Sequence, residues 1–167
     1  MSLTVRPARP SDAVAMADLI NAIIAVGGTT AYEDPFDATS MDAAYISLPQ
    51  LVSCFVAEDG AELVGFQGLM WSFDPDDPLP EGWATIGTFA RLGLTQRGVG
   101  GALFAATLEA ARAARVAVID ATIRADNTGG LAFYARQGFV DYDRLVGVPL
   151  RDGTPTDRIR KRFDITA

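Results

Sequence analysis

Residues 95–104 read Thr-Gln-Arg-Gly-Val-Gly-Gly-Ala-Leu-Phe and lie between a predicted strand, Trp83 to Leu92, and a predicted long helix, Gly98 to Ala114. Glycines at such a junction let the backbone approach a ligand closely and leave several amide groups pointing outward. Together with the positive end of the helix dipole, these amides form a cradle for a pyrophosphate group. Arg97 can add a charge-assisted hydrogen bond. The alternative explanation for the glycines is a tight turn with close helix packing.

Two common phosphate-binding motifs do not describe this stretch. Gly-x-x-x-x-Gly-Lys-Ser/Thr does not occur, and Lys161 is the only lysine of the chain. A dinucleotide-binding fingerprint has its glycines at the first turn of an early strand-helix-strand unit. Here four predicted strands precede the glycines, so both motifs are excluded.

The hydrophobic pattern along the chain predicts an α/β fold in one domain, residues 1–167. Antiparallel strands come first and a strand-helix-strand unit follows, which favours one mixed sheet with helices on both faces. Arg158 to Ile165 alternates charged and apolar residues and is expected to form an edge strand. The other expected strands are 3–6, 52–57, 63–73, 83–92, 116–123 and 139–148. The first expected helix begins at residue 11 or 12 and is stopped by the glycines at 27 and 28, and the other expected helices are 40–47, 98–114 and 128–137.

The composition limits the classes of function. Net charge is −7 and the pI is about 4.5, which disfavours a nucleic-acid-binding surface. The chain has no histidine, which excludes Ser-His-Asp and Cys-His catalysis and the commonest zinc ligand, so we expect no metal. Cys54 is the single cysteine, and no apolar run resembles a membrane span or a signal peptide. We therefore expect a cytoplasmic protein without a membrane partner.

With these residues in view, the sequence resembles the GNAT superfamily of N-acetyltransferases. The family pattern is Arg/Gln-x-x-Gly-x-Gly/Ala before an apolar helix, and Thr95 stands where the family usually has Arg or Gln. Asn127 to Phe139 is similar to the family segment Asn-x6-Tyr-x3-Gly-Phe. Ile20 to Phe36 looks like the substrate-side region of phosphinothricin-acetyltransferase-like members. The two main motifs occur in the family order, about thirty residues apart.

The resemblance implies a fold, a reaction and a partner. The fold is a mixed, mostly antiparallel, splayed sheet flanked by helices on both faces, the acyl-CoA N-acyltransferase fold. The reaction is direct transfer of an acetyl group from acetyl-CoA to the primary amine of a small molecule, such as an amino acid or an amino-acid analogue. Late strands of this superfamily often pair across subunits, so the resemblance also implies a homodimer.

The resemblance also assigns roles to particular residues. Tyr134 matches the tyrosine that protonates the leaving thiolate, with a structural core tyrosine as the alternative. Asn127 matches an asparagine that contacts the cofactor, although asparagine is also an ordinary helix cap. The strand before the glycine loop would bind the pantetheine arm and the thioester carbonyl. The predicted cofactor-binding residues are Phe89, Ala90, Arg91, Arg97, Gly98, Val99, Gly100, Gly101, Ala102 and Asn127.

The general base is left open by the sequence. Many relatives carry a glutamate on the fourth strand, but Trp83 to Thr88 contains no carboxylate. Glu33, Asp34 and Glu81 are the nearest candidates by position, and a water chain is the alternative. Two other functions also remain open: a non-catalytic acyl-CoA sensor, and a protein N-terminal or lysine acetyltransferase. The aromatic residues that could line an acceptor pocket are Tyr32, Phe36, Trp71 and Phe73.

Overall fold

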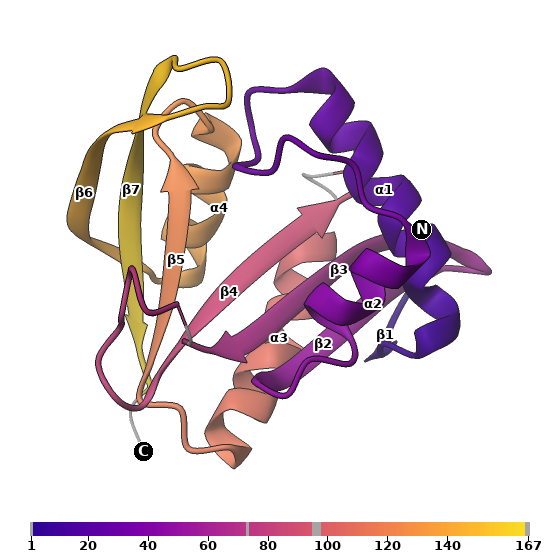
Figure 1. Ribbon diagram of the computed structural model, residues 1–167. Helices are drawn as coiled ribbons and strands as arrows, with labels where there is room; N and C mark the ends of the chain where they lie inside the picture. The colour runs from indigo at the N-terminus through magenta and orange to yellow at the C-terminus, as the bar shows by residue number, and fades with distance from the viewer. Residues whose placement is uncertain (1, 73, 95–97, 166–167) are drawn as a thin grey trace.

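The computed structural model describes residues 2–72, 74–94 and 98–165, and in these ranges seven strands form one sheet (Figure 1). The sheet order is β1-β2-β3-β4-β5-β7-β6. The strands are β1 (Leu3–Pro7), β2 (Leu51–Asp59), β3 (Glu62–Trp71), β4 (Trp83–Ala90), β5 (Val118–Arg124), β6 (Val140–Pro149) and β7 (Pro155–Asp164). The helices are η1 (Pro10–Asp12), α1 (Ala13–Val26), α2 (Ala38–Tyr45), α3 (Val99–Ala113) and α4 (Thr128–Gln137).

Helices cover both faces of the sheet, as predicted. In Figure 1, α1 and α2 lie in front of the sheet and α3 and α4 lie behind it. We call the α1/α2 side the front face and the α3/α4 side the rear face. On the front face, Met16, Ile20 and Met41 pack against Phe66 of β3. On the rear face, Phe104 and Ile119 belong to a core that also includes Phe139.

The sheet splays between its fourth and fifth strands. Neighbouring strands are antiparallel except β4 and β5, which run parallel. These two pair only from Trp83 with Val118 to Thr85 with Asp120. Beyond Thr85 and Asp120 they diverge toward the top of Figure 1, and we call the opening between them the β4–β5 gap. The predicted splayed, mixed sheet is therefore confirmed.

One strand position was predicted wrongly. Residues 155–164 form β7, which pairs with β5 on one side and β6 on the other, so β6 is the edge strand at this end of the sheet. The alternation of charged and apolar residues has another cause. Phe163 packs into the rear core, while Arg160 on the front face meets the carboxylates of Asp77 and Asp120. An interior strand tolerates charges when its neighbours supply counter-charges.

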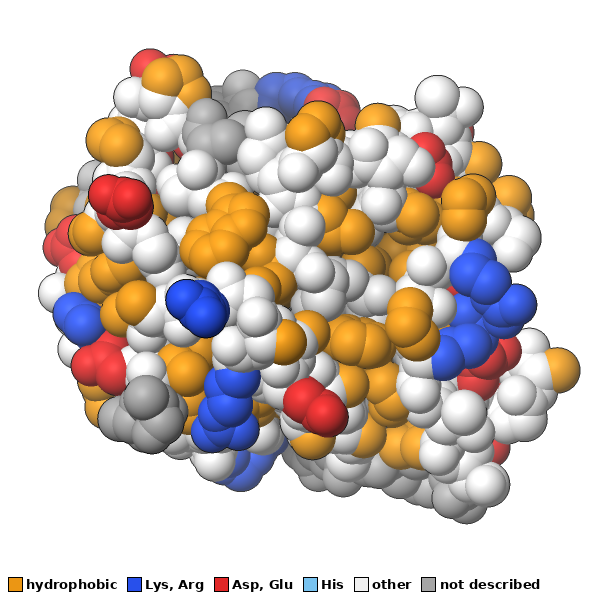
Figure 2. Space-filling view, turned by 90° about the horizontal axis from the view of Figure 1, so that it is seen from below, with side chains coloured by type: hydrophobic (Ala, Val, Ile, Leu, Met, Phe, Trp, Pro, Cys, Tyr) orange, Lys and Arg blue, Asp and Glu red, His pale blue; other side chains and the backbone are white. Residues whose placement is uncertain are grey.

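The surface at the lower end of the sheet is apolar but distant from the β4–β5 gap. Figure 2 shows hydrophobic side chains gathered over the underside of the molecule. A hollow of about 320 Å³ lies where β2 begins and α3 ends, and it is lined by Pro7, Ala8, Ile46, Leu51, Val52, Ser53, Cys54, Phe55 and Ala110. None of the predicted site residues lines it. Within the described ranges, no helix is both long and apolar enough to cross a membrane.

Candidate active site

The β4–β5 gap exposes backbone groups of β4. The N–H of Arg91 donates to the carbonyl of Val64 on β3, 2.8 Å away. Because the backbone groups of successive strand residues point to opposite sides, Phe89 and Arg91 face β3 whereas Thr88 and Ala90 face the gap. There β5 is no longer paired with β4. The gap can therefore accept an extended ligand that hydrogen-bonds to β4 as a strand would.

The three residues predicted to bind a pantetheine arm occupy different environments. Ala90 directs its backbone into the gap. Phe89 instead places its ring on the front face, 5.1 Å from that of Phe66. The side chain of Arg91 forms an exposed ion pair with Glu62. Thr88, which the sequence did not single out, provides the second backbone position at the gap.

Tyr134 lies at the rear of the gap. Its phenol oxygen is 2.8 Å from the Oγ1 of Thr88, and the Nε2 of Gln67 donates to the same Thr88 oxygen over 2.9 Å. Burial raises the pKa of Tyr134 to about 12. The phenol consequently keeps its proton at neutral pH, as a general acid must.

The hydrogen bonds around Thr88 leave the Tyr134 proton available. Gln67 already donates to Thr88, so the single Thr88 proton can be given to the Tyr134 oxygen. The phenol then has its own proton to donate to a group in the gap. Gln67 is fully buried, and among the described residues its Oε1 has no hydrogen-bond partner.

The start of α3 supplies amide donors. Gly98, the residue before the helix, has a left-handed φ of 82° and makes no side-chain cap. The first-turn amides of a helix have no intrahelical partner, and the hydrogen-bond ladder of α3 begins with Ala102 N to Gly98 O at 3.0 Å. Val99, Gly100 and Gly101 therefore offer N–H groups to an anion. Arg97 lies outside the described residues.

The glycines of this segment serve different purposes. Gly98 adopts a positive φ that favours glycine. At Gly100 a Cβ would come within 2.5 Å of a ring carbon of Phe133, so this glycine lets α4 pack on α3. At Gly101 a Cβ would have nothing nearer than the Gln137 amide nitrogen at 3.9 Å. Backbone geometry therefore explains Gly98 and close packing explains Gly100. Neither explains Gly101, beside which there is open space.

Asn127 acts as the N-cap of α4. Its Oδ1 accepts a hydrogen bond from the N–H of Gly130 at 2.9 Å, and its Nδ2 donates to the carbonyl of Thr29 at 2.9 Å. The capping alternative is therefore realised, and both ends of the amide are used within the protein. The second bond also connects α4 to the segment that follows α1.

Residues 29–34, which we call the strap, cross the front of the gap. The carbonyl of Thr30 accepts from Arg124 of β5 at 3.3 Å, and Glu33 accepts from the N–H of Arg151 at 3.0 Å. Asp34 forms an ion pair with the Arg151 side chain. Figure 1 shows this segment running from α1 toward α4 and the β6–β7 turn. The strap bounds the opening through which an acceptor could reach the gap.

None of the three carboxylates proposed as general base is placed as a free base in the gap. Glu33 and Asp34 are exposed and are engaged by Arg151. Glu81 precedes the first residue of β4, whereas Thr88 lies near its other end. At roughly 3.3 Å per strand residue, about 20 Å separate Glu81 from the Thr88 position.

Aromatic side chains line the front of the gap. The Tyr32 ring lies 5.0 Å from that of Phe36 and 6.2 Å from that of Phe89, and its hydroxyl is 2.8 Å from that of Tyr45. The Tyr45 ring packs against Gly68, where a Cβ would approach it to 2.7 Å. Tyr32 and Phe36 are two of the four aromatic residues that the sequence named as candidates for an acceptor pocket, and that role stays a prediction. Trp71 packs into the rear core instead, and Phe73 lies outside the described residues.

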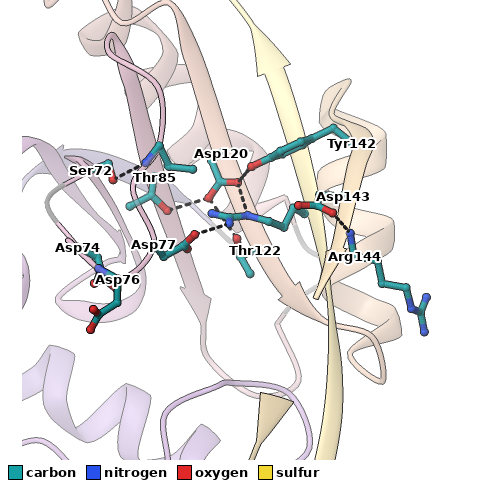
Figure 3. A network of polar contacts seen from close by, with 12 residues as sticks. Ser72, Asp74, Asp76, Asp77, Thr85, Asp120, Thr122, Tyr142, Asp143 and Arg144 are labelled. Atoms are coloured by element: carbon teal, nitrogen blue, oxygen red, sulfur yellow. Dashed lines mark hydrogen bonds and ion pairs between the residues drawn. The ribbon is translucent and has the colours of Figure 1, made fainter. Parts of the chain in front are cut away.

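A buried carboxylate that the sequence analysis missed marks the point where β4 and β5 part (Figure 3). Asp120 is 1% exposed, and its oxygens accept hydrogen bonds from Tyr142 at 2.5 Å and from Thr122 at 3.2 Å. Arg160 lies 3.4 Å from it and pairs at 2.8 Å with Asp77 in the loop before β4. This network anchors the loop across the lower front face. The feature of the sequence that could have indicated this buried carboxylate is an aspartate within the apolar run of β5.

A splayed α/β sheet, together with a helix that begins at a glycine next to the opening, defines an acyl-CoA-dependent transferase fold. The model of the acetyltransferase (GNAT) family matches residues 21–139, and the chain belongs to that family. The predicted family and fold are confirmed, and the protein is an N-acetyltransferase. A search of curated proteins finds no match.

Solved structures share this fold at low sequence identity. A candidate acetyltransferase from Salmonella typhimurium, with its cofactor acetyl-CoA, has a TM-score of 0.83 and 16% identity over 99% of this chain and 95% of its own. A candidate phosphinothricin N-acetyltransferase has a TM-score of 0.81 and 22% identity over 99% and 100%. Ribosomal-protein-alanine N-acetyltransferase from Brucella melitensis has a TM-score of 0.79 and 21% identity over 97% and 99%.

Proposed function

We propose that this chain transfers an acetyl group from acetyl-CoA to the primary amine of a small molecule in the cytoplasm, with residues 1–167 acting as one catalytic domain. The observation that carries the proposal is the meeting of three features at the β4–β5 gap. These are the backbone of Thr88 and Ala90, the protonated phenol of Tyr134, and the strap that bounds the front. Together they provide a channel, an acid and an enclosed acceptor side.

Acetyl-CoA fits the donors that the chain presents. The amides of Val99, Gly100 and Gly101 at the start of α3 would hold the pyrophosphate, with Gly98 setting the turn. The amide of Ala102, also predicted to bind the cofactor, already donates to the carbonyl of Gly98 within the helix. The backbone of Ala90 and Thr88 would bind the pantetheine arm along the gap. The acetyl-CoA in the Salmonella typhimurium structure of the same fold supports this assignment.

The reaction follows from the position of Tyr134. The acceptor nitrogen, once neutral, attacks the thioester carbon; a carbon–nitrogen bond forms and the carbon–sulfur bond breaks. The sulfur leaves as a thiolate and takes the Tyr134 proton, since the phenol stays protonated below its raised pKa of about 12. The attacking nitrogen releases one proton to solvent as the amide forms, and a proton taken up from solvent restores the Tyr134 phenol. No covalent enzyme intermediate is involved. Cys54 does not compete as a nucleophile, because burial raises the pKa of its thiol to about 12.

A small acceptor is favoured by the strap. The carbonyls of Thr29 and Thr30 accept hydrogen bonds from Asn127 and Arg124, and these bonds tie the strap to the far side of the gap. A protein acceptor, such as the ribosomal protein named for the Brucella melitensis structure, would need this side to be open to an extended chain. A non-catalytic sensor would have no use for a phenol at the gap.

The test of this function compares a charged and an uncharged side chain of similar size at the start of α3, and measures the effect of each on acetyl-CoA binding. Gly101 is the third residue of α3, where an added side chain has room and an aspartate favours helix formation. We expect Gly101→Asp to weaken acetyl-CoA binding by more than tenfold in calorimetry, and Gly101→Asn to weaken it much less. Equal affinities for both folded variants would contradict the assignment. A thiol-release assay of the parent enzyme against amino acids, polyamines and aminoglycosides then identifies the acceptor class.

A further inference from the structure

Arg158 stands out among the arginines of β7 because no described carboxylate pairs with it. It lies on β7 directly opposite Arg124 of β5. Its Nε is buried and makes no hydrogen bond, and within the described ranges no carboxylate forms an ion pair with its guanidinium. A buried donor without an acceptor is costly, so the side chain is poised for an acceptor that comes from outside the protein.

The neighbouring arginines show the contrast. Arg124 pairs with Asp126 at 2.8 Å, Arg160 pairs with Asp77 at 2.8 Å, and Arg162 pairs with Asp164 at 2.8 Å. The chain has 21 acidic and 14 basic side chains, so carboxylates are in excess. A lone arginine in such a chain is not explained by a shortage of acidic partners.

The position of Arg158 places it beside the acceptor side of the gap. Arg124 lies under the strap, since its guanidinium donates to the carbonyl of Thr30. Directly opposite residues on neighbouring strands have Cβ atoms about 5 Å apart, so the Cβ of Arg158 on β7 lies at about this distance from that of Arg124. Arg124 belongs to β5, and β5 borders the gap. Two arginine side chains therefore leave the sheet from directly opposite positions, and Asp126 pairs with that of Arg124.

We propose that Arg158 binds the carboxylate of the acceptor, so that the substrates are amines that also carry a carboxylate. This inference rests on the proposed function. A guanidinium presents a planar pair of N–H donors that matches a carboxylate in two parallel hydrogen bonds. Such a contact orients the acceptor with its amine toward the thioester in the gap and neutralises the excess charge of the Arg124–Arg158 pair.

The experiment compares each acceptor with its uncharged counterpart. The twenty standard amino acids and their carboxamides are assayed by thiol release with acetyl-CoA, using the parent enzyme, Arg158→Gln and Arg162→Gln. Arg162→Gln is the control, because it removes one positive charge from the same face of β7. We expect the parent to prefer the acids, and Arg158→Gln to lower kcat/KM for the acids by about 10- to 100-fold with little change for the carboxamides. Arg162→Gln should leave the preference intact.

A binding measurement gives an independent readout. Amino acids that are substrates should raise the Tm of the parent and of Arg162→Gln, but not that of Arg158→Gln, and Arg158→Lys should recover part of the shift. Equal losses for acids and carboxamides, or acetylation of carboxylate-free amines alone, would overturn the role of Arg158 and leave the proposed function standing. Thiol release from no amine, with unchanged acetyl-CoA affinity in Gly101→Asp, would overturn the proposed function itself.

Discussion

The hydroxyl oxygen of Thr88 on β4 lies 2.8 Å from the phenol oxygen of Tyr134 on α4. This contact joins the strand that borders the β4–β5 gap to the helix behind it. It fixes the phenol at the gap although 46 residues separate the two in the sequence. The role proposed for Tyr134 depends on this placement.

Tyr134→Phe removes the phenol oxygen and keeps the ring. We expect kcat to fall by about 10²- to 10⁴-fold, the usual effect of losing a positioned acid, while acetyl-CoA affinity is retained. Both quantities should be measured on the same folded preparation, with Tyr142→Phe as a control that removes a phenol oxygen hydrogen-bonded to Asp120. A kcat within about threefold of the parent would mean that another group protonates the thiolate.

The raised pKa of Tyr134 also predicts how stability depends on pH. The phenol titrates at about 12 in the folded protein and near 10 when unfolded, so the folded state holds this proton more tightly. The resulting stabilisation is complete below about pH 10 and is lost as the pH rises toward 12, by about 3 kcal/mol in total. Urea titrations between pH 9 and 11 should show a steeper decline for the parent than for Tyr134→Phe. Parallel declines would contradict the buried, neutral phenol.

Asp120→Ala should destabilise the protein without direct loss of chemistry. The change removes the buried partner of Arg160 and leaves the Tyr142 hydroxyl unpaired, at a cost of about 3–5 kcal/mol in the free energy of unfolding. Replacing both members of the pair, as in Asp120→Val with Arg160→Leu, should recover most of this loss. Asp164→Ala, which removes the exposed carboxylate that pairs with Arg162, should have little effect in the same denaturant titration.

The homodimer implied by the family resemblance remains a prediction, and the structure directs its test to β6. This edge strand exposes Val140 by 61% and Val146 by 78%, whereas β7 is paired on both sides. An unpaired apolar edge favours pairing with a second copy. Val146→Lys should therefore shift sedimentation toward the monomer, with Val14→Lys as the control at a valine of α1 that is 60% exposed. A monomer at every concentration of the parent would refute the dimer.

Local patterns in the sequence determined the elements and the family. The glycines at 98, 100 and 101 before an apolar helix, and the spacing from Asn127 to Tyr134, are each contained in one short segment. Period-two and period-3.6 hydrophobic patterns likewise depend on neighbours in the chain. The mixed sheet and its helices could therefore be predicted, with most boundaries shifted by one to three residues.

Only the tertiary structure decided which residues meet at the gap. Thr88 and Gln67 approach Tyr134 because β3, β4 and α4 pack together, and nothing in their own segments indicates it. The inner place of β7 depends on carboxylates supplied from β5 and from the loop before β4. The lone guanidinium of Arg158 has the same origin. Whether a charge finds a partner is settled by strands that are distant in sequence and adjacent in space, and a linear pattern does not encode that adjacency.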